Sequence, residues 1–577
     1  MGSYDEKPWL RWYDDHVSAE IAIPDYSYLE FLEKGMSLNP ENVACHFLGT
    51  SVTYRELNTL ADRFARFLVE GGCGKGDVVG INLPNTPQYL AAMVGTLRAG
   101  CVISGVSPLL SPREIVHQAN DSGAKVLLTL DALLEHRLAG IADQIPALKH
   151  VVATSIADHL PFLKRFIGKL LKKVPSGKIV PLEGKQVIAY NQLMTSFPAE
   201  RPTVSLTPDD TCLLQYTGGT TGPSKGVVLT HRNVLCNYSQ TIRWFYNDVG
   251  PEQDLLDFQG GRETVCSGFP FFHIAGLCLG LIHLAGGNTQ VLIPDPRNTH
   301  QICSDVKKYR PTQMSNVPTL YQMIMENPAF SGIDFSQLRE CVSGAAPFDV
   351  DSIARFESFV GQGKVVELYG MTETSPMITI NPVHGKKKIG SVGVPIQSTR
   401  IKIVDVADAK TEMPIGEPGE LIVSGPQVMK EYHGNPEATR ESIEEIDGER
   451  YLHTGDVARM DEDGFVYIVD RTKDMLLVGG FNVYSKQVEE TLYEIPEIEF
   501  CAIVGEPHPE RPGSEIVKAV IQLKEEEKGR DEDGFKEKIL SYCRENMAPY
   551  CVPKIVAFID EIPLTAVGKV DKKALRK

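Results

Sequence analysis

Residues 216–226 (Tyr-Thr-Gly-Gly-Thr-Thr-Gly-Pro-Ser-Lys-Gly) concentrate glycine, hydroxyl and one cation in a single stretch. Glycine accepts positive φ and lets backbone N–H groups approach an anion, while threonine hydroxyls and a lysine ammonium add donors and charge. A Walker A loop ends in Gly-Lys-Ser/Thr, whereas Lys225 lies between Ser224 and Gly226, so the ordinary P-loop class is disfavoured. A flexible surface loop is the alternative. We predict a cradle for the phosphates of ATP, formed by Thr217, Gly218, Gly219, Thr220, Thr221, Gly222 and Lys225.

Further chemistry-bearing segments follow this loop along the chain. They are Glu-Leu-Tyr-Gly-Met-Thr-Glu-Thr at 367–374, Tyr-Leu-His-Thr-Gly-Asp at 451–456, Asp-Arg-Thr-Lys-Asp at 470–474 leading to Gly-Gly-Phe-Asn-Val at 479–483, and Pro-Leu-Thr-Ala-Val-Gly-Lys at 563–569. With the loop, they resemble the ordered motifs of the adenylate-forming superfamily, which contains acyl-CoA synthetases, luciferases and peptide-synthetase adenylation domains. The resemblance covers nearly the whole chain and is closest to bacterial and archaeal medium- or long-chain fatty-acyl-CoA ligases. Departures from the motifs at Ser224, Ser485 and Val567 remove no group that does chemistry.

The resemblance implies an ATP-dependent fatty-acid–CoA ligase, an acid–thiol ligase that works in two steps. A carboxylate attacks the α-phosphate of ATP to give acyl-AMP and pyrophosphate, and coenzyme A then gives acyl-CoA and AMP. The apolar, glycine-broken lining around residues 271–280 favours a medium- or long-chain fatty acid. An aryl (benzoate-type) CoA ligase and a non-catalytic nucleotide-binding homologue are the alternatives. No carrier-protein segment follows the last motif, so coenzyme A is the expected thiol.

Attack on the α-phosphate requires charge to be neutralised on both sides of the phosphorus, which cations and Mg²⁺ can do. The expected metal ligands are Glu373 and Thr217. Mg²⁺ is usually held through one or two carboxylates plus phosphate oxygens, which favours Glu373, and Thr217 belongs to the predicted phosphate loop. The resemblance assigns Lys569 to the carboxylate and α-phosphate oxygens, where a long ammonium side chain can follow developing charge. His273 matches a position where acyl group and thiol meet, with a core histidine as the alternative. The expected catalytic residues are Thr217, Lys225, His273, Glu373 and Lys569.

Other motif residues are expected to hold the nucleotide and coenzyme A. By resemblance, Asp456 accepts both ribose hydroxyls, Arg471 approaches the ribose and phosphate, and Tyr369 stacks on adenine. Residues 344–347 resemble a small-residue wall beside the base, with a tight turn as the alternative. Besides the phosphate loop, the implied binding set is Gly344, Ala345, Ala346, Glu367, Tyr369, Gly370, Met371, Thr372, Asp456, Arg471, Lys473, Gly479, Gly480, Phe481 and Lys569.

Helical and β-rich patterns alternate along the first half of the chain. Residues 54–70 have a helical pattern, whereas 78–82 and 126–129 are short apolar runs bounded by glycine, a rhythm that indicates an α/β class. The chain of 577 residues exceeds what one core usually supports, so more than one domain is expected.

We predict a large N-terminal domain over residues 1–470, with layered α/β subdomains, a smaller strand-rich subdomain and the ATP and acyl sites. Residues 471–577 are predicted to form a small, mobile α+β C-terminal lid domain, with a strand at 517–522 and a helix at 533–545. The resemblance makes Lys473 the hinge of that domain. Three lysines near the C-terminus are expected to be solvated: Lys572, Lys573 and Lys577.

Composition narrows the class of partner and the compartment. The net charge of -17 argues against nucleic acid, because phosphate neutralisation needs clustered lysine and arginine. The 12 cysteines include no C-x-x-C pair and no histidine at zinc spacing, which suits free thiols in a reducing compartment. The N-terminus lacks the basic and apolar blocks of a secretory signal. We therefore expect a cytoplasmic protein, and the sequence leaves its oligomeric state open.

Two segments bear on membranes. From Leu160 to Lys173, apolar residues recur at helical spacing with basic residues between them, which suits an interfacial helix on anionic lipid at the inner membrane face. A helix packed on the domain with a solvated basic rim is the equal alternative. Residues 265–294 carry no charged side chain, but five glycines, two histidines and a polar run interrupt them, so a buried core helix of about a dozen residues from Ile274 is expected.

Overall fold

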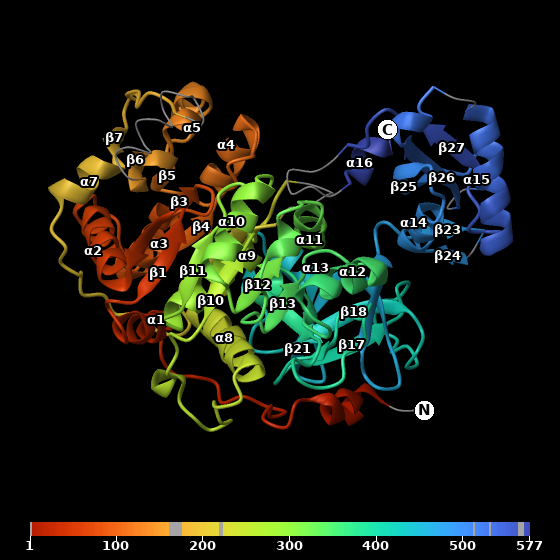
Figure 1. Cartoon of the computed structure of the whole chain (residues 1–577), viewed down its shortest axis with the longest axis horizontal. Helices are drawn as coiled ribbons and strands as arrows, with labels where there is room; N and C mark the ends of the chain where they lie inside the picture. Colours follow the sequence, from red (N-terminus) through yellow and green to blue (C-terminus); the bar gives the residue numbers. More distant parts are fainter. Residues whose placement is uncertain are drawn as a thin grey trace.

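The computed structural model describes residues 3–160, 176–217, 223–479, 481–511, 514–529, 532–563 and 570–576. It is a mixed α/β protein with a large N-terminal domain of layered sheets and helices and a smaller C-terminal domain, the blue lobe in Figure 1. This architecture confirms the predicted fold class. Strand β22 (Val466–Arg471) ends one residue after the predicted boundary between residues 470 and 471, which stays a prediction.

One sheet of the N-terminal domain is parallel except at one edge, where β9 and β19 run antiparallel. The parallel strand β3 is buried along its whole length, as expected for an apolar run in a sheet covered on both faces. The strand order is β19 (Glu431–Tyr432), β9 (Gly226–Thr230), β8 (Thr211–Tyr216), β4 (Val102–Gly105), β3 (Val78–Asn82), β5 (Val126–Leu130), β6 (His150–Thr154) and β7 (Gln186–Ala189).

A second sheet lies beside the first and contains a parallel block, β14-β13-β12-β10-β11-β1. Antiparallel strands close both of its edges. The strand order is β16 (Val394–Pro395), β15 (Met377–Ile380), β14 (Val365–Gly370), β13 (Glu340–Ser343), β12 (Gln313–Asn316), β10 (Thr264–Ser267), β11 (Thr289–Leu292), β1 (Val43–Phe47) and β2 (Thr50–Thr53).

The strand-rich subdomain and the C-terminal domain are predominantly antiparallel. The subdomain contains β17 (Arg400–Val404), β18 (Gly419–Ser424), β21 (Glu449–Met460) and β20 (Ile443–Ile446), with β22 paired to β21. The C-terminal domain contains the hairpin β23 (Leu476–Val478) and β24 (Phe481–Val483), the sheet β25 (Ile498–Pro507), β26 (Glu515–Leu523) and β27 (Ile555–Phe558), and helices α14 (Ser485–Tyr493), α15 (Glu532–Asn546) and α16 (Lys572–Leu575). The C-terminal domain has its own apolar core, built largely from β25, β26 and α14.

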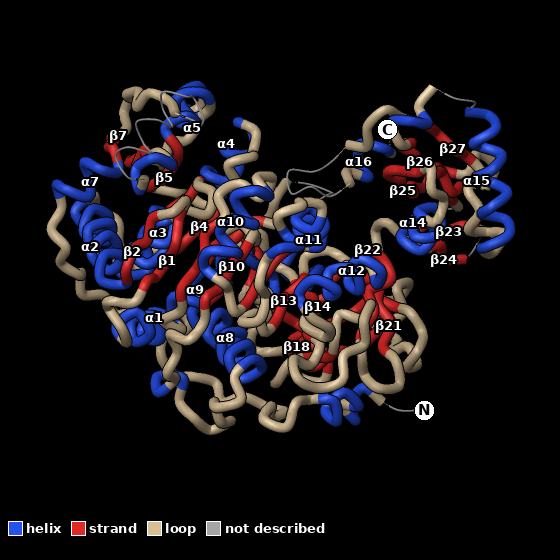
Figure 2. The backbone as a smooth tube through the Cα atoms, viewed as in Figure 1, coloured by secondary structure: helices blue, strands red, loops and turns tan. Residues whose placement is uncertain are grey.

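Figure 2 shows helices lying against the sheets throughout the N-terminal domain. They are α1 (Tyr28–Ser37), α2 (Tyr54–Glu70), α3 (Pro87–Arg98), α4 (Pro112–Asp121), α5 (Asp131–His136), α7 (Tyr190–Ser196), α8 (His231–Phe245), α9 (Ile274–Ala285), α10 (Thr299–Tyr309), α11 (Pro318–Met325), α12 (Val350–Val360) and α13 (Pro436–Ser442).

Helix α2 spans the predicted residues because local signals define its start and its buried face. Thr53 and Glu56 form a capping box, which satisfies backbone N–H groups at the first turn. Buried residues at helical spacing then face α3. There Gly95 permits close packing, since a Cβ at that position would lie 2.7 Å from the Ala61 carbonyl oxygen.

The apolar segment 265–294 contains α9, a buried helix of 12 residues that begins at Ile274, as predicted. Among the described residues no helix is long and apolar enough to cross a membrane. The predicted amphipathic helix between Leu160 and Lys173 lies outside the described residues beyond its first residue.

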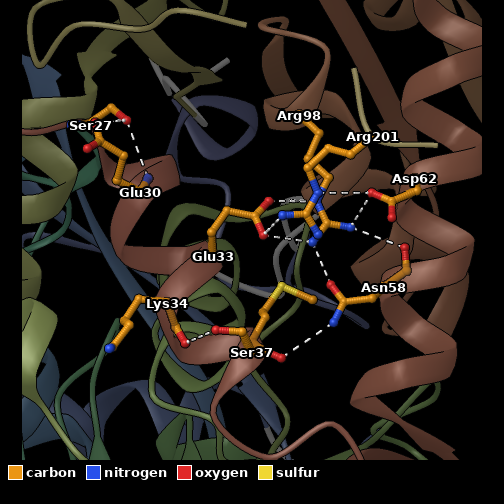
Figure 3. A network of polar contacts seen from close by, with 10 residues as sticks. Ser27, Glu30, Glu33, Lys34, Ser37, Asn58, Asp62, Arg98 and Arg201 are labelled. Atoms are coloured by element: carbon orange, nitrogen blue, oxygen red, sulfur yellow. Dashed lines mark hydrogen bonds and ion pairs between the residues drawn. The ribbon is translucent and has the colours of Figure 1, made fainter. Parts of the chain in front are cut away.

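A fully buried arginine joins α1, α2 and α3 (Figure 3). Arg98 donates to both carboxylate oxygens of Glu33, at 2.7 and 3.0 Å, and to Asp62 at 2.9 Å. Asn58 accepts from the same guanidinium, and Arg201 pairs with both carboxylates from outside. This network joins the three helices to one another.

Replacing Arg98 with alanine should be strongly destabilising, because Glu33 and Asp62 would remain partly buried without their shared partner. We expect a loss of about 3 kcal/mol in the free energy of unfolding, measured by urea denaturation. The exposed pair of Arg355 and Glu326 supplies the control, since Arg355→Ala should cost less than about 1 kcal/mol. Equal losses in the two variants would contradict a structural role for the Arg98 network.

Candidate nucleotide and acyl site

A continuous cavity of about 2780 Å³ lies where the sheets of the N-terminal domain meet and where the C-terminal segment approaches them. Typical small-molecule pockets occupy roughly 300–1,000 Å³, so this cavity has room for two ligands at once. Thr217 follows β8, Ala345 and Ala346 follow β13, and Tyr369 lies near the end of β14. Ligands in open α/β sheets bind at these carboxyl ends.

One wall of the cavity is organised around the buried carboxylate of Asp456. The pairing of β21 with β22 sets Asp456 opposite Arg471, and Arg471 Nε lies 2.8 Å from Asp456 Oδ1. The hydroxyl of Tyr369 donates to Asp456 Oδ2 at 2.6 Å. The structure therefore brings together three residues that were predicted from three separate motifs.

A second buried carboxylate, Glu373, lines the same cavity. Tyr432 donates its hydroxyl to Glu373 Oε1 at 2.7 Å, and Lys225 Nζ lies 4.6 Å from the centre of the Tyr432 ring. Burial raises the pKa of Glu373, although Tyr432, Arg471 and Lys225 favour the ionised form. A bound cation would relieve this unfavourable burial of charge.

The surroundings of Glu373 suit a magnesium site that the nucleotide completes, rather than a site built from several protein ligands. In the described part of the chain, no group of three or more His, Cys, Asp or Glu residues is arranged to hold a metal. Mg²⁺ commonly uses one or two protein carboxylates and completes its shell with phosphate oxygens and water. A lone carboxylate in the same cavity as Lys225 therefore fits Mg²⁺ that arrives with the nucleotide.

The base of the phosphate loop is fixed by backbone pairing and by α4. Thr217 N donates to the Lys225 carbonyl at 3.0 Å, and Tyr216 pairs with Gly226 across β8 and β9. The Tyr216 hydroxyl donates to Asp121 of α4 at 2.6 Å. The loop residues Gly218, Gly219, Thr220, Thr221 and Gly222 lie outside the described residues.

The turn after β13 contains residues whose small size is required. A Cβ at Gly344 would lie 2.8 Å from Leu368 Cδ1, and Ala345 adopts a φ of +66°. A Cβ at Gly370 would lie 1.8 Å from the Pro376 carbonyl oxygen, so only glycine fits there. The cavity lining includes Ala345, Ala346, Glu367, Gly370, Met371 and Thr372, but not Gly344.

His273 lines the cavity at the N-terminus of α9. Its ring accepts a hydrogen bond from Ala275 N at 3.4 Å, so the side chain acts as the helix cap. This contact accords with the structural alternative, and the functional role of His273 stays a prediction.

The predicted coenzyme A residues lie apart from the nucleotide residues. Gly479 and Phe481 belong to the β23–β24 hairpin, and Phe481 is exposed and stacks on Tyr550 with ring centres 4.6 Å apart. Neither residue lines the cavity. Lys473 does line it, and burial lowers the pKa of this lysine. Gly480 and Lys569 lie outside the described residues.

The prediction that Lys572 is solvated is wrong. Its ammonium lies 2.7 Å from Glu489 Oε1 and donates to Ser485 Oγ at 2.6 Å. Ser485 in turn donates to Asp470 at 2.9 Å. The error arose because composition cannot reveal that Lys572 of α16 contacts Ser485 and Glu489 of α14.

Tyr432 is the clearest functional candidate that sequence reasoning missed. It lies in β19, which pairs with β9 more than 200 residues earlier in the chain. No spacing rule connects it to Glu373, 59 residues away. Only the sheet register could have identified it.

Two carboxylates, their tyrosine partners and basic groups around one cavity define an α/β enzyme of the adenylate-forming architecture. The AMP-binding enzyme family matches residues 32–433, and the AMP-binding enzyme C-terminal domain matches residues 487–569. The chain belongs to this family, as the motifs predicted.

Similar proteins match along almost the whole chain. The long-chain-fatty-acid–CoA ligase of Escherichia coli O6:H1 is 36% identical and covers 99% of this chain and 98% of its own. The long-chain-fatty-acid–CoA ligase of Bacillus subtilis (strain 168) is 35% identical over the same shares. Among solved structures, the anthranilate CoA ligase AuaEII in complex with anthranoyl-AMP has a TM-score of 0.78 at 25% identity, covering 96% of this chain and 97% of its own.

Glu367 offers a test of how burial shapes this cavity. It accepts a hydrogen bond from Gly390 N at 3.1 Å, and burial raises its pKa from 4.5 to about 7. The protonated form is thus favoured in the fold. Wild-type stability should fall, relative to Glu367→Gln, as pH rises from 4.5 through 7. The difference at pH 8 should approach about 3 kcal/mol as an upper bound.

Denaturation of both proteins across this pH range measures the effect. Glu437→Gln, at an exposed position of α13, is the matched control and should show no such pH dependence. A constant difference between wild type and Glu367→Gln from pH 4 to pH 8 would contradict the raised pKa.

Proposed function

We propose that this protein is an AMP-forming acyl-CoA synthetase. It would join a carboxylic acid to AMP with release of pyrophosphate, and then transfer the acyl group to coenzyme A with release of AMP. The observation that carries the proposal is that Glu373 and Asp456 face one cavity together with Lys225, Tyr369 and Arg471. The match to ligases over the whole chain supports it, as does a structural relative in complex with an acyl-adenylate.

We assign the adenosine to the wall formed by Tyr369, Asp456 and the turn at 344–346. Asp456 already has Tyr369 and Arg471 as polar partners, which suits a carboxylate that exchanges one partner for ribose hydroxyls. Tyr369 offers an aromatic face in the cavity for adenine, and Arg471 adds positive charge beside the phosphates. Gly370, Met371, Thr372 and Glu367 would complete this wall.

Attack on the α-phosphate would take place between Lys225, Thr217 and Glu373. Bound Mg²⁺ would neutralise phosphate charge there. Lys225 and Thr217 lie at the two ends of the phosphate loop, so both can follow the nucleotide as it binds. Lys569, assigned from its motif, would complete the charge neutralisation from the C-terminal domain.

The thiol step would use the C-terminal domain in a second position. We assign Gly479, Gly480 and Phe481 to the pantetheine arm and Lys473 to the hinge, with residues 1–470 and 471–577 as the two rigid parts. The exposure of Phe481, which is not among the residues that line the cavity, supports a rotation between steps. The chain of contacts from Lys572 through Ser485 to Asp470 would have to break during that rotation.

We propose a long-chain fatty acid as the substrate. The cavity continues from Ser343 between α8 and α9, where Ile242, Phe245, Cys278 and Ile282 supply an apolar lining. The names of the full-length relatives support this choice. An aryl acid is the competing outcome, because AuaEII is an anthranilate CoA ligase.

We further propose a cytoplasmic location with peripheral contact at the inner membrane face, made by the segment between Leu160 and Lys173. The proposal rests on the periodic basic and apolar residues of that segment. Binding of the full chain to anionic vesicles, reversed by salt, would support it. Equal recovery with neutral vesicles would contradict it.

Pyrophosphate release with ATP and a series of fatty and aryl acids tests the function directly. We expect turnover without coenzyme A for a limited number of cycles, and sustained turnover when coenzyme A is added. The highest kcat/KM should fall among long-chain fatty acids. Silence with every acid would favour a non-catalytic nucleotide-binding protein.

Replacement of Lys569 with alanine should separate the two half-reactions. Loss of its charge should slow acyl-AMP formation by roughly 100-fold or more, while thiolysis of supplied acyl-AMP stays largely intact. The exposed Lys554 of the same domain provides the control, and Lys554→Ala should change neither step. Equal slowing of both steps by Lys569→Ala would overturn the assignment.

A further inference from the structure

The acyl part of the cavity ends in polar groups. Strand β13 leads from Ser343 at the nucleotide end to Glu340 at the opposite end, a span of roughly 10 Å. The lining at that far end includes Gln313, Glu340, His283 and Tyr246. A chain that ended only in a methyl group would place hydrocarbon against these residues.

The sheet register explains why polar side chains face the cavity here. One row of paired residues crosses β11, β10, β12 and β13, and it consists of Gln290, Val265, Gln313 and Glu340. Paired residues on neighbouring strands point to the same face. The next row along the strands, Val291, Cys266, Met314 and Cys341, belongs to the apolar cluster on the opposite face. The row that contains Gln313 and Glu340 therefore lies on the cavity side.

Residues from other elements converge on this row. Arg339 pairs with Glu263, which also accepts from the Thr312 hydroxyl at 2.6 Å. Burial, with the carboxylates of Glu263 and Glu340, raises the pKa of Tyr246, so its hydroxyl keeps its proton. Burial also raises the pKa of Glu340 to about 7, which makes its protonated form available as a donor.

His283 supplies an independent observation. Its side chain is 95% buried and lines the cavity, yet Nε2 has no hydrogen-bond partner among the described residues. Nδ1 lies 3.4 Å from Asn288 Nδ2, and burial lowers the pKa of the ring to about 3, so the imidazole is neutral. An unpaired buried polar atom is costly unless a ligand or water satisfies it.

We propose that Tyr246, His283 and Glu340 form a binding site for a neutral hydrogen-bonding group, a terminal hydroxyl, at the ω end of the acyl chain. This inference rests on the proposed function and specifies its substrate. Acids long enough to reach the site are preferred when they carry an ω-hydroxyl. A methyl-terminated acid of the same length leaves the polar groups unpaired.

The chemistry of the site selects a hydroxyl over a charged group. Arg339 already pairs with Glu263 and lies 3.9 Å from Glu340, so the site holds charges of both signs, and an ω-carboxylate or ω-ammonium would meet a like charge and bear the cost of burying its own charge. A hydroxyl both donates and accepts, and so can pair with Tyr246 and His283 together.

Matched pairs of ω-hydroxy and unsubstituted saturated acids, taken over a range of chain lengths, test the site in the full-length protein. We expect kcat/KM for pyrophosphate release to favour the ω-hydroxy acid by about five-fold at lengths that reach the site, with no preference among shorter acids. Tyr246→Phe should reduce the preference towards unity. Glu340→Leu should also raise kcat/KM for the unsubstituted acid.

Tyr309→Phe is the control for Tyr246→Phe, because Tyr309 on α10 stacks on His46 and does not line the cavity. It should keep the wild-type preference. Thermal unfolding of each variant identifies any loss caused by misfolding, and Glu340→Leu supplies a second chemical route to the same result.

Calorimetric binding of the same acid pairs separates this inference from the proposed function. Equal affinity and equal kcat/KM within every pair would overturn the ω-hydroxyl site while leaving the ligase function intact. Tighter binding of the ω-hydroxy acid without turnover of any acid would support the site and contradict the function. A preference unchanged in both Tyr246→Phe and Glu340→Leu would also overturn the site.

Discussion

Two buried carboxylates, Glu373 and Asp456, constrain the whole architecture. Removing an ionised carboxylate from water is unfavourable unless donors or cations replace the lost hydration. Each carboxylate therefore has a tyrosine hydroxyl within 2.7 Å, and positive side chains stand nearby. The partner residues come from β14, β19 and β22, which belong to three different sheets. The three sheets must come together for these partners to reach the two buried carboxylates, and the cavity lies where they do so.

Polar contacts beside this cavity also link the C-terminal domain to the N-terminal domain. Asp470, close to the end of β22, accepts from Ser485 at the start of α14, and Ser485 accepts from Lys572 of α16. Lys572 also pairs with Glu489. These contacts join α14 and α16 of the small domain to the strand that carries Arg471. The position of the small domain is thus set by a few polar contacts beside the active cavity.

The cavity has different chemistry at its two ends. Near the nucleotide wall, buried carboxylates and basic residues suit phosphate, ribose and metal. At the far end, the row formed by Gln313 and Glu340 places hydrogen-bonding groups where a hydrocarbon chain would finish. Both ends are built from the parallel strand β13, which starts at Glu340 and ends at Ser343. The proposed nucleotide site and the proposed ω-hydroxyl site therefore lie at opposite ends of one short strand.

The sequence by itself determined the family, the α/β class and many elements, because these depend on motif order and local periodicity. Helical spacing predicted α2, an apolar run predicted β3, and the glycines, histidines and polar run within residues 265–294 predicted α9 rather than a membrane span. Tertiary structure alone decided the contact of Tyr432 with Glu373, the ion pair of Lys572 with Glu489 and the placement of Gln313 and Glu340 on the cavity side. These contacts join residues that are distant in the chain. They depend on sheet register and side-chain packing, so local sequence patterns do not predict them.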